Sequence, residues 1–425
     1  MKLPPSTLLA TLIAIASVAG AVLYTQKAAK LTSSSPELIQ KIAALQKQID
    51  ILKGENETLT KLQVNGAEIT LPIVHYKFVE KNLGLTFPKH VKARRVDNEL
   101  LAESVRYRYT QQFGMNGMEM RKYAFENLGI MPPNQHLLNQ LAIAETAGAV
   151  AIYDSSANEI LLSPEFDDEN LLHTTSIIKH LSIALLELNF PLSDDQKTNL
   201  TDDGYYAREA FIKGRASSIA QRYRNITAFK GGHTKQFKPN EEAKETFNSL
   251  PILIRGLATF PAIHGKTYIE DIMLNNSSVF PELYQHMPRS TATIFAKKMP
   301  LTDPTTDPQK LRKPLAENQN LSTQLGQIFT ILYLRQLGPL NDKNGTNGTK
   351  SNTTELHKKL TSDHLTITQR QKEYTTTWET NWETEADAQA FYKLATELST
   401  IPERKPSVNR LGNQVIIAFI DIHNS

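Results

Sequence analysis

A long apolar stretch near the middle of the chain reads Ile177-Ile-Lys-His-Leu-Ser-Ile-Ala-Leu-Leu-Glu-Leu-Asn-Phe-Pro-Leu192. Its apolar residues recur at steps of three and four, which places them on one face of a helix. That face consists of Ile177, Leu181, Ala184, Leu185 and Leu188. We expect a helix over about 169–189 that packs on the core of the domain.

Two short apolar runs precede this helix. Residues 149–153 and 159–163 read as strands, and the Asp-Ser-Ser-Ala-Asn between them has turn chemistry, so the pattern predicts a β-hairpin. Further segments are predicted as helices over 98–120, 205–223 and 385–398, and as strands over 374–381 and 414–420. The sequence therefore predicts an α+β fold that is mainly helical, with a small β-sheet.

The 177–192 stretch resembles the zinc-site helix of a bacterial zincin-like metallopeptidase-related family, written H-E-L-x-H-A-L-Q-D-Q-H-F-x-L. Further segments resemble that family in the same order. Residues 209–216 resemble its A-L-V-E-G-D-A segment, which supplies the third zinc ligand, and 288–294 resemble its P-x-S-T-E-Q-I-L segment. Residues 382–391, followed by 410–415, resemble its C-terminal W-x-T-x-x-D-A-x-x-F segment and strand. The resemblance runs from about residue 100 to the end and implies a zincin-like domain over 70–425.

A zincin binds its metal through two histidines at i and i+4 on one helix, and a glutamate between them acts as the general base. The resemblance places Lys179 and Ile183 at these ligand positions, His180 at the base position and Lys213 at the third-ligand position. An ammonium group repels a dication, and isoleucine has no lone pair. These four relict zinc-site positions therefore imply no catalytic residues, no metal and no cofactor.

The other groups of polar residues in this region are not predicted to form a metal or catalytic site. His173, His180 and Glu187 are spaced by seven residues, about 10 Å along a helix, so neighbours in this set are too far apart to share one metal ion. We expect surface or satisfied interior polar residues there. We also expect an ion pair between Arg208 and Glu209, and a solvated helix start at Asp202-Asp203.

Residues 1–30 are predicted to be a signal anchor or a signal peptide. An uncharged apolar run from Leu8 to Tyr24 follows Lys2, and its length is near the lower limit of a membrane span. Ala19-Gly20-Ala21 fits a signal-peptidase site. We favour the anchor because a coiled-coil pattern follows directly. The expected location is the cell membrane, single-pass with an extracytoplasmic C-terminal domain, or periplasmic or secreted if the segment is cleaved.

Residues 36–64 are predicted to form a coiled-coil stalk. Apolar residues recur at alternating steps of four and three, which is the spacing of a coiled-coil seam. One a position of this seam holds asparagine, a residue that fixes the register of paired helices. The seam is Leu38, Ile42, Leu45, Ile49, Leu52, Asn56 and Leu59. The pattern favours a homo-oligomer. The alternative is a short helix packed on its own domain, which Gly54 supports.

Composition excludes several classes of function. The chain of 425 residues has no cysteine, which excludes disulfides, thiolate metal sites and cysteine nucleophiles. Its net charge of +3 comes from Lys2, Lys27 and Lys30 in the N-terminal segment, so no nucleic-acid partner is predicted. The densest basic patch, 90–95, is expected to be a solvated face. The polar residues 341–357 are expected to form a disordered loop.

Together these patterns indicate an exported, catalytically inactive zincin-like protein that acts in binding or scaffolding at the cell envelope. Its expected partners are a protein or peptide ligand in the relict groove, the membrane through the N-terminal helix, and further copies of the chain. Two alternatives remain. One is an active hydrolase that uses a non-standard site near His180, and the other is a purely structural stalked envelope protein.

Overall fold

The computed structural model describes most of the chain after residue 65 and little before it. The described residues are 41, 45, 46, 49, 50, 53, 66, 68–193, 196, 200–229, 240–299, 320–341, 355–370, 373–398 and 406–422. The chain divides into two compact units, Met1–Asn65 and Gly66–Ser425. Within the described residues, no helix combines the length and the apolarity that crossing a membrane requires. The predicted anchor or signal peptide, residues 1–30, lies outside them.

The described residues of the first unit are helical, as the heptad pattern over 36–64 predicts. Leu45, at a predicted seam position, is 52% exposed. Gln46 Nε2 donates to Asp50 Oδ1 at 3.1 Å, an i,i+4 contact typical of a helix. The rest of the predicted stalk, including Asn56, lies outside the described residues.

The first sheet of the second unit has the strand order β1-β2-β4-β3. Its strands are β1 Glu68–Ile69, β2 Lys92–Arg95, β3 Ala151–Asp154 and β4 Glu159–Leu162. β2 and β4 are parallel, and the other two neighbouring pairs are antiparallel. The predicted hairpin is confirmed as β3 and β4, and β3 lies at an edge of the sheet.

The prediction of a solvated face over 90–95 is confirmed for His90, Lys92 and Arg95, which are exposed, and is wrong for Arg94. Arg94 lies in strand β2 and is buried. Arg94 Nε donates to Glu159 Oε2 on β4 at 3.1 Å. Arg95 Nη1 donates to the carbonyl oxygen of Pro164 at 2.8 Å. Both guanidinium groups therefore fasten β2 to its surroundings.

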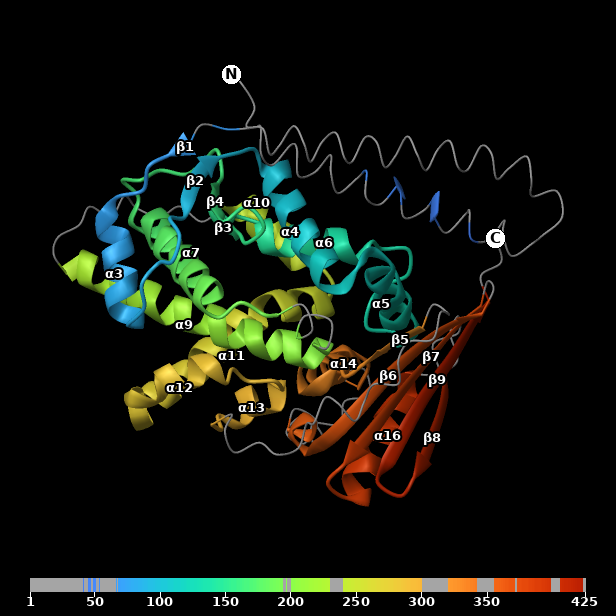
Figure 1. Cartoon of the computed structure of the whole chain (residues 1–425). Helices are drawn as coiled ribbons and strands as arrows, with labels where there is room; N and C mark the ends of the chain where they lie inside the picture. The colour runs from blue at the N-terminus through green and yellow to red at the C-terminus, as the bar shows by residue number, and fades with distance from the viewer. Residues whose placement is uncertain are drawn as a thin grey trace. The chain divides into compact units, whose positions relative to one another are not determined.

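Three long helices form the centre of this unit: α7 Leu171–Asn189, α9 Asp202–Phe229 and α11 Ile252–Asn276. α7 packs against β3 on one side and α9 on another, and α9 packs against α11 (Figure 1). The helix predicted over 169–189 is confirmed, because Ile177, Leu181, Ala184 and Leu185 of its apolar face are buried.

The backbones of α9 and α11 approach each other at two glycines. A Cβ atom on Gly265 would lie 1.9 Å from the carbonyl oxygen of Ala210, and one on Gly214 would lie 2.3 Å from the carbonyl carbon of Gly265. Only hydrogen fits at these two positions without a shift of backbone. The close crossing fixes the position of α9 and therefore of the polar side chains that precede Gly214.

Shorter helices surround this centre: α3 Ile73–Leu83, α4 Asn98–Phe113, α5 Met115–Asn127, α6 Leu137–Thr146, α10 Glu241–Ser249, α12 Phe280–Gln285 and α13 Thr291–Ala296, with the 3-10 turn η1 Ser277–Val279. The single helix predicted over 98–120 is wrong, because the chain breaks at Gly114. That glycine has φ 70°, a left-handed value that glycine adopts without steric cost and that ends α4 before α5 begins.

The second sheet is entirely antiparallel, with the order β5-β6-β7-β9-β8. Its strands are β5 Asn320–Thr323, β6 Leu360–Arg370, β7 Glu373–Trp382, β8 Ser407–Leu411 and β9 Gln414–Ile422, and its helical neighbours are α14 Gly326–Asn341, η5 Leu356–Lys359 and α16 Glu385–Leu398. The sheet, coloured orange to red, lies to one side of α9 and α11 (Figure 1). The strands predicted over 374–381 and 414–420 and the helix over 385–398 are confirmed.

The predicted polar loop over 341–357 is wrong at both ends. α14 runs to Asn341, and Leu356 and His357 are buried in η5. Residues 342–354 lie outside the described residues. The second unit is therefore a mixed α+β structure, mostly helical, with two small sheets rather than the one predicted.

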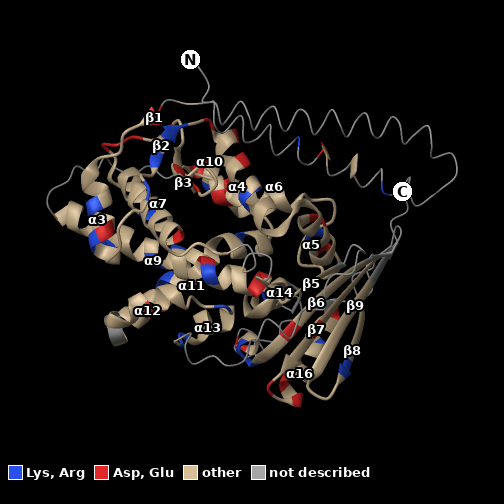
Figure 2. Cartoon of the chain, viewed as in Figure 1, with Lys and Arg blue, Asp and Glu red and all other residues tan. Residues whose placement is uncertain are grey.

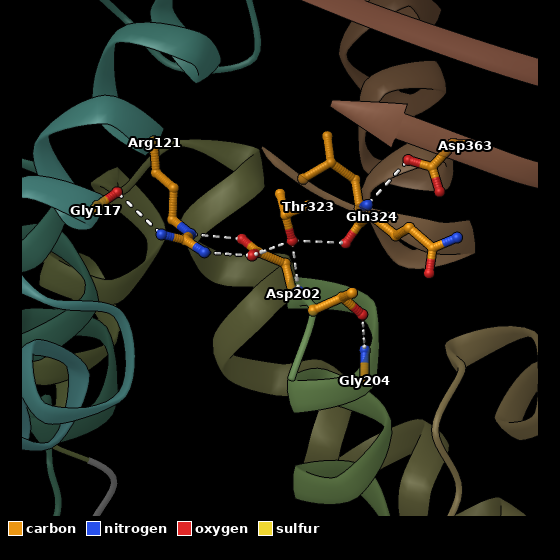
Figure 3. Close-up of polar contacts among 9 residues, drawn as sticks. Gly117, Arg121, Asp202, Gly204, Thr323, Gln324 and Asp363 are labelled. Atoms are coloured by element: carbon orange, nitrogen blue, oxygen red, sulfur yellow. Dashed lines mark hydrogen bonds and ion pairs between the residues drawn. The ribbon is translucent and has the colours of Figure 1, made fainter. Parts of the chain in front are cut away.

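A buried ion pair joins the start of α9 to α5 and the second sheet (Figure 3). Arg121 on α5 donates to Asp202 through Nε at 2.7 Å and through Nη2 at 2.5 Å. Thr323 on β5 donates its hydroxyl to Asp202 Oδ1 at 2.8 Å and accepts from the Asp202 backbone N–H at 3.0 Å. The predicted solvated start at Asp202-Asp203 is therefore wrong, since the two residues are only 1% and 5% exposed.

The neighbouring carboxylates complete this junction. Asp203 Oδ1 accepts from the backbone N–H of Thr291 at 2.9 Å and from the Thr291 hydroxyl. Asp363 on β6 accepts from the backbone N–H groups of Leu325 and Gly326, both at 2.9 Å. A Cβ atom on Gly326 would lie 1.8 Å from Asp203 Oδ1, so the chain passes the carboxylate closely at this glycine.

Candidate functional site

A cleft of about 1070 Å³ opens between α7 and α9. Side chains from α4, α6, β3, α7, α9, α10 and α11 line it. The four residues that the sequence singled out, Lys179, His180, Ile183 and Lys213, all line this cleft. The structure thus brings Lys213, on α9, to the same cavity as the three residues on α7.

The face of α7 that lines the cleft is a different side of the helix from the apolar face that packs on the core. Lys179, Ile183 and Glu187 follow each other at i, i+4 and i+8, so they lie along one side of the helix. The apolar face with Leu181 and Leu185 is turned into the core. Residues of both charge signs occur on α4, α7 and α9 (Figure 2).

Four charged residues form a connected network at the cleft. Arg108 Nη2 on α4 lies 2.5 Å from Glu145 Oε2, at the end of α6. Lys213 Nζ lies 3.4 Å from the same oxygen and 2.7 Å from Glu209 Oε2. Tyr109 donates its hydroxyl to the other oxygen of Glu145 at 2.7 Å. The network contains two cations and two carboxylates, so it is electrically neutral.

Burial and ion pairing shift the pKa values of these groups in opposite directions. Burial alone would raise the pKa of Glu145, but the charges of Arg108 and Lys213 outweigh it and hold that pKa well below its ordinary range. Burial alone would lower the pKa of Lys213, and the carboxylates of Glu145 and Glu209 outweigh it, so the pKa is raised. All of these groups are therefore charged at neutral pH.

Lys179 differs from Lys213 in its partners. It is partly exposed in the cleft, and no carboxylate among the described residues lies within ion-pair distance of it. Burial lowers the pKa of Lys179, the positive charge of Lys213 lowers it further, and Glu145 offsets only part of this.

The two histidines of the cleft accept hydrogen bonds from the backbone. His180 Nδ1 accepts from the backbone N–H of Tyr153 on β3 at 3.1 Å, and His173 Nδ1 accepts from that of Asp167 at 3.0 Å. An accepting Nδ1 carries no proton, so each neutral ring is protonated at Nε2. Burial, followed by the charge of Lys179, lowers the pKa of His180 well below its ordinary value. The prediction of satisfied polar residues is confirmed for both histidines.

The residues of the cleft do not form a metal site. Among the described residues, no group of three or more histidines, aspartates and glutamates is placed to hold a metal ion. Glu145 and Glu209 offer carboxylate oxygens beside one relict position, and the lysine at that position, Lys213, already binds both of them. A lysine ammonium at the centre of a donor set excludes a dication from the same place.

Arg108 and Glu145 of the network were not predicted from the sequence, and the predicted partner of Glu209 is wrong. Arg108 and Glu145 lie on different helices, and no local pattern connects them. Glu209 pairs with Lys213 one helical turn away and not with Arg208, whose Nη2 donates to the carbonyl oxygen of Phe190 at 3.0 Å. The i,i+4 spacing of Glu209 and Lys213 was a signal that could have identified this pair.

Glu187 is the carboxyl group of the cleft that is easiest to protonate. Burial and then the charge of Glu209 raise its pKa to about 7 from an ordinary value of 4.5. Between these two pH values the folded chain binds more protons at this site than the unfolded chain does. Stability therefore falls as the pH rises through that window.

We expect Glu187→Gln to remove this loss of stability with rising pH. At pH 8 the variant should be more stable than the original chain by on the order of 1–2 kcal/mol, and the gain should vanish near pH 4.5. Urea unfolding at several pH values measures the effect. Glu165→Gln is the control, since Glu165 lines the same cleft but has a lowered pKa. An equal gain at both positions would contradict the assignment.

In comparisons with known proteins, no family model, no curated protein and no solved structure matches the chain.

Proposed function

We propose that the chain is a catalytically inactive zincin-like protein that binds a protein or peptide ligand in the cleft between α7 and α9. One observation carries this proposal: Lys179, His180, Ile183 and Lys213, the positions at which the resemblance locates zinc chemistry, line one cavity. In that cavity the ammonium group of Lys213 pairs with the carboxylates of Glu145 and Glu209, which a metal ion would otherwise attract. We further propose that residues 1–30 anchor the chain in the cell membrane and that the domain acts outside the cytoplasm.

An active hydrolase that depends on His180 has less support. A general base needs a nitrogen lone pair that is free to take a proton from water. The lone pair of His180 Nδ1 accepts the backbone N–H of Tyr153, and Nε2 carries the proton of the neutral ring. This arrangement fastens α7 to β3 and gives His180 a structural role.

The zinc content of the purified chain tests the loss of catalysis. We expect far less than one zinc per chain by elemental mass spectrometry after dialysis against zinc and removal of unbound metal, and no peptide hydrolysis that a chelator suppresses. His180→Ala should leave the metal content unchanged. Stoichiometric zinc that disappears in His180→Ala would overturn the proposal in favour of the hydrolase.

The purely structural alternative is tested on the cleft surface. Lys179→Glu should alter the set of partners that the chain captures from envelope extracts, whereas Lys244→Glu should not. Lys244 lines the rim of the cleft and is 63% exposed, in an ion pair with Glu241. An unchanged set of partners with Lys179→Glu would favour the structural role.

We also propose that the 36–64 segment joins copies of the chain. The half-exposed Leu45 supports this, because a coiled-coil seam remains uncovered until a second helix packs on it. Leu45→Glu is expected to shift the mass of the chain in detergent solution, measured by light scattering, toward that of a monomer. Gln46→Glu, one residue outside the seam, should leave the mass unchanged. An unaltered mass in Leu45→Glu would contradict self-association through this segment.

A further inference from the structure

The cations that line the cleft differ in whether a carboxylate already neutralises them. Glu145 pairs with Arg108, Lys213 lies between Glu145 and Glu209, and Lys244 pairs with Glu241. Within the described part of the chain, no carboxylate lies at ion-pair distance from Lys179. Lys179 therefore contributes one unit of positive charge to the cleft wall that no described carboxylate neutralises.

The other acidic groups of the cleft do not neutralise Lys179. Glu187 lies eight residues further along α7, about 12 Å along the helix axis. Glu165 lies at the N-terminal side of α7, where its charge acts on His173. Glu145, the carboxylate whose charge acts on Lys179, is already engaged by two other cations.

His180 adds a second donor next to Lys179. Its Nδ1 is occupied by the backbone N–H of Tyr153, so the proton of the neutral ring is on Nε2. Both residues line the cavity of about 1070 Å³, which is large enough for a short peptide or a drug-sized molecule.

We propose that the ligand of the cleft carries a carboxylate, which pairs with the ammonium group of Lys179 and accepts a hydrogen bond from His180 Nε2. This inference rests on the proposed function of the cleft in ligand binding, and it names the chemical class of the ligand. A monoanion matches the single positive charge of Lys179, which has no carboxylate partner among the described residues. A dianion such as a phosphate monoester would be repelled by Glu145 and Glu209 more strongly than a monoanion.

Binding of a carboxylate is favourable on general grounds. Lys179 is desolvated and stands near Lys213, so its charged state is costly in the empty cleft. A carboxylate would neutralise that charge in surroundings where water screens the interaction weakly. A charge-assisted hydrogen bond of this kind typically contributes more than a neutral one.

The test compares matched probes on the full-length chain. N-acetylphenylalanine carries a carboxylate, its amide is the neutral counterpart, and phenyl phosphate is the dianion. We expect the acid to bind at least about tenfold more tightly than the amide by calorimetry. Lys179→Met should abolish this preference, and Lys244→Met should retain it. Lys179→Met should fold normally, because it removes no ion pair.

A second measurement locates the binding. In a chain with 13C-labelled lysine, the acid should raise the pKa of Lys179 in an NMR titration, and the amide should leave it unchanged. Equal binding of the acid and the amide would overturn the carboxylate inference. A preference for the acid that survives Lys179→Met would overturn it too. Either result would still be compatible with ligand binding in the cleft. Tighter binding of phenyl phosphate would overturn the choice of a monoanion. Failure of all three probes to bind would count against the cleft as a ligand site altogether.

Discussion

Lys213→Met is expected to lower the free energy of unfolding by about 3–5 kcal/mol. The substitution removes the ammonium group that lies 2.7 Å from Glu209 and 3.4 Å from Glu145. Among the described residues, Glu209 would then have no cation at ion-pair distance, and Glu145 would keep only Arg108. Breaking a buried pair by removing one partner leaves an uncompensated charge, which costs more than the pair itself contributes.

Lys179→Met is the matched control for this prediction. It changes a lysine of the same cleft, also at a relict zinc-site position, but one that has no ion pair with a described residue. We expect its free energy of unfolding to be unchanged or slightly higher, because burial disfavours the charge that the substitution removes. Urea or thermal unfolding measures both variants. Equal losses at the two lysines would show that the network around Lys213 does not act as described.

A double substitution separates the network from simple packing. If the cost of Lys213→Met comes from a stranded carboxylate, adding Glu209→Gln should recover part of it, so the two effects should not add. An additive result would instead assign the cost to lost contacts of the lysine side chain. This outcome would leave the geometry of the cleft intact but remove the electrostatic argument for a neutral network.

The elements predicted correctly from the sequence are those whose signal is local. The apolar face of α7 repeats within nineteen residues, and the β3–β4 hairpin has its turn between two adjacent apolar runs. The break at Gly114 was also visible, since a glycine in a helical pattern is a common stop signal. The helix predicted over 98–120 ran through this signal.

The second sheet was only partly predicted because its strands are rich in threonine and charged residues. β6 reads Leu-Thr-Ser-Asp-His-Leu-Thr-Ile-Thr-Gln-Arg, in which Leu365 and Ile367 are buried and their neighbours are not. Such alternation indicates a strand with one solvated face. The signal is weak over eleven residues, and β7, its partner, could be recognised more easily by its tryptophans.

The candidate site was predicted in its positions but not in its contacts. The resemblance grouped Lys179, His180, Ile183 and Lys213 as one set. The partners of Lys213 depend on how α6, α7 and α9 pack, which no local pattern determines. The same holds for Asp202: a pair of aspartates at a helix start is usually solvated, and only the packing of α5 and β5 against it buries the pair.

The other prediction of comparable size concerns that buried aspartate. Asp202→Asn is expected to lower the free energy of unfolding by about 3–5 kcal/mol, since it removes the charge that neutralises Arg121. The Arg121 side chain is 7% exposed and that of Asp202 only 2%, so water cannot replace the lost partner. The amide would also present a donor where Arg121 requires an acceptor.

Asp203→Asn is the control, because the adjacent aspartate is nearly as deeply buried but is not held by an arginine. Burial raises the pKa of Asp203 to about 7, against the opposing hydrogen bonds from Thr291, so its carboxyl group is close to half protonated at neutral pH. An asparagine oxygen can still accept from the Thr291 backbone. We therefore expect a loss below about 1 kcal/mol at pH 7. Comparable losses at Asp202 and Asp203 in urea unfolding would show that packing, and not the pairing with Arg121, stabilises the junction between α9 and the second sheet.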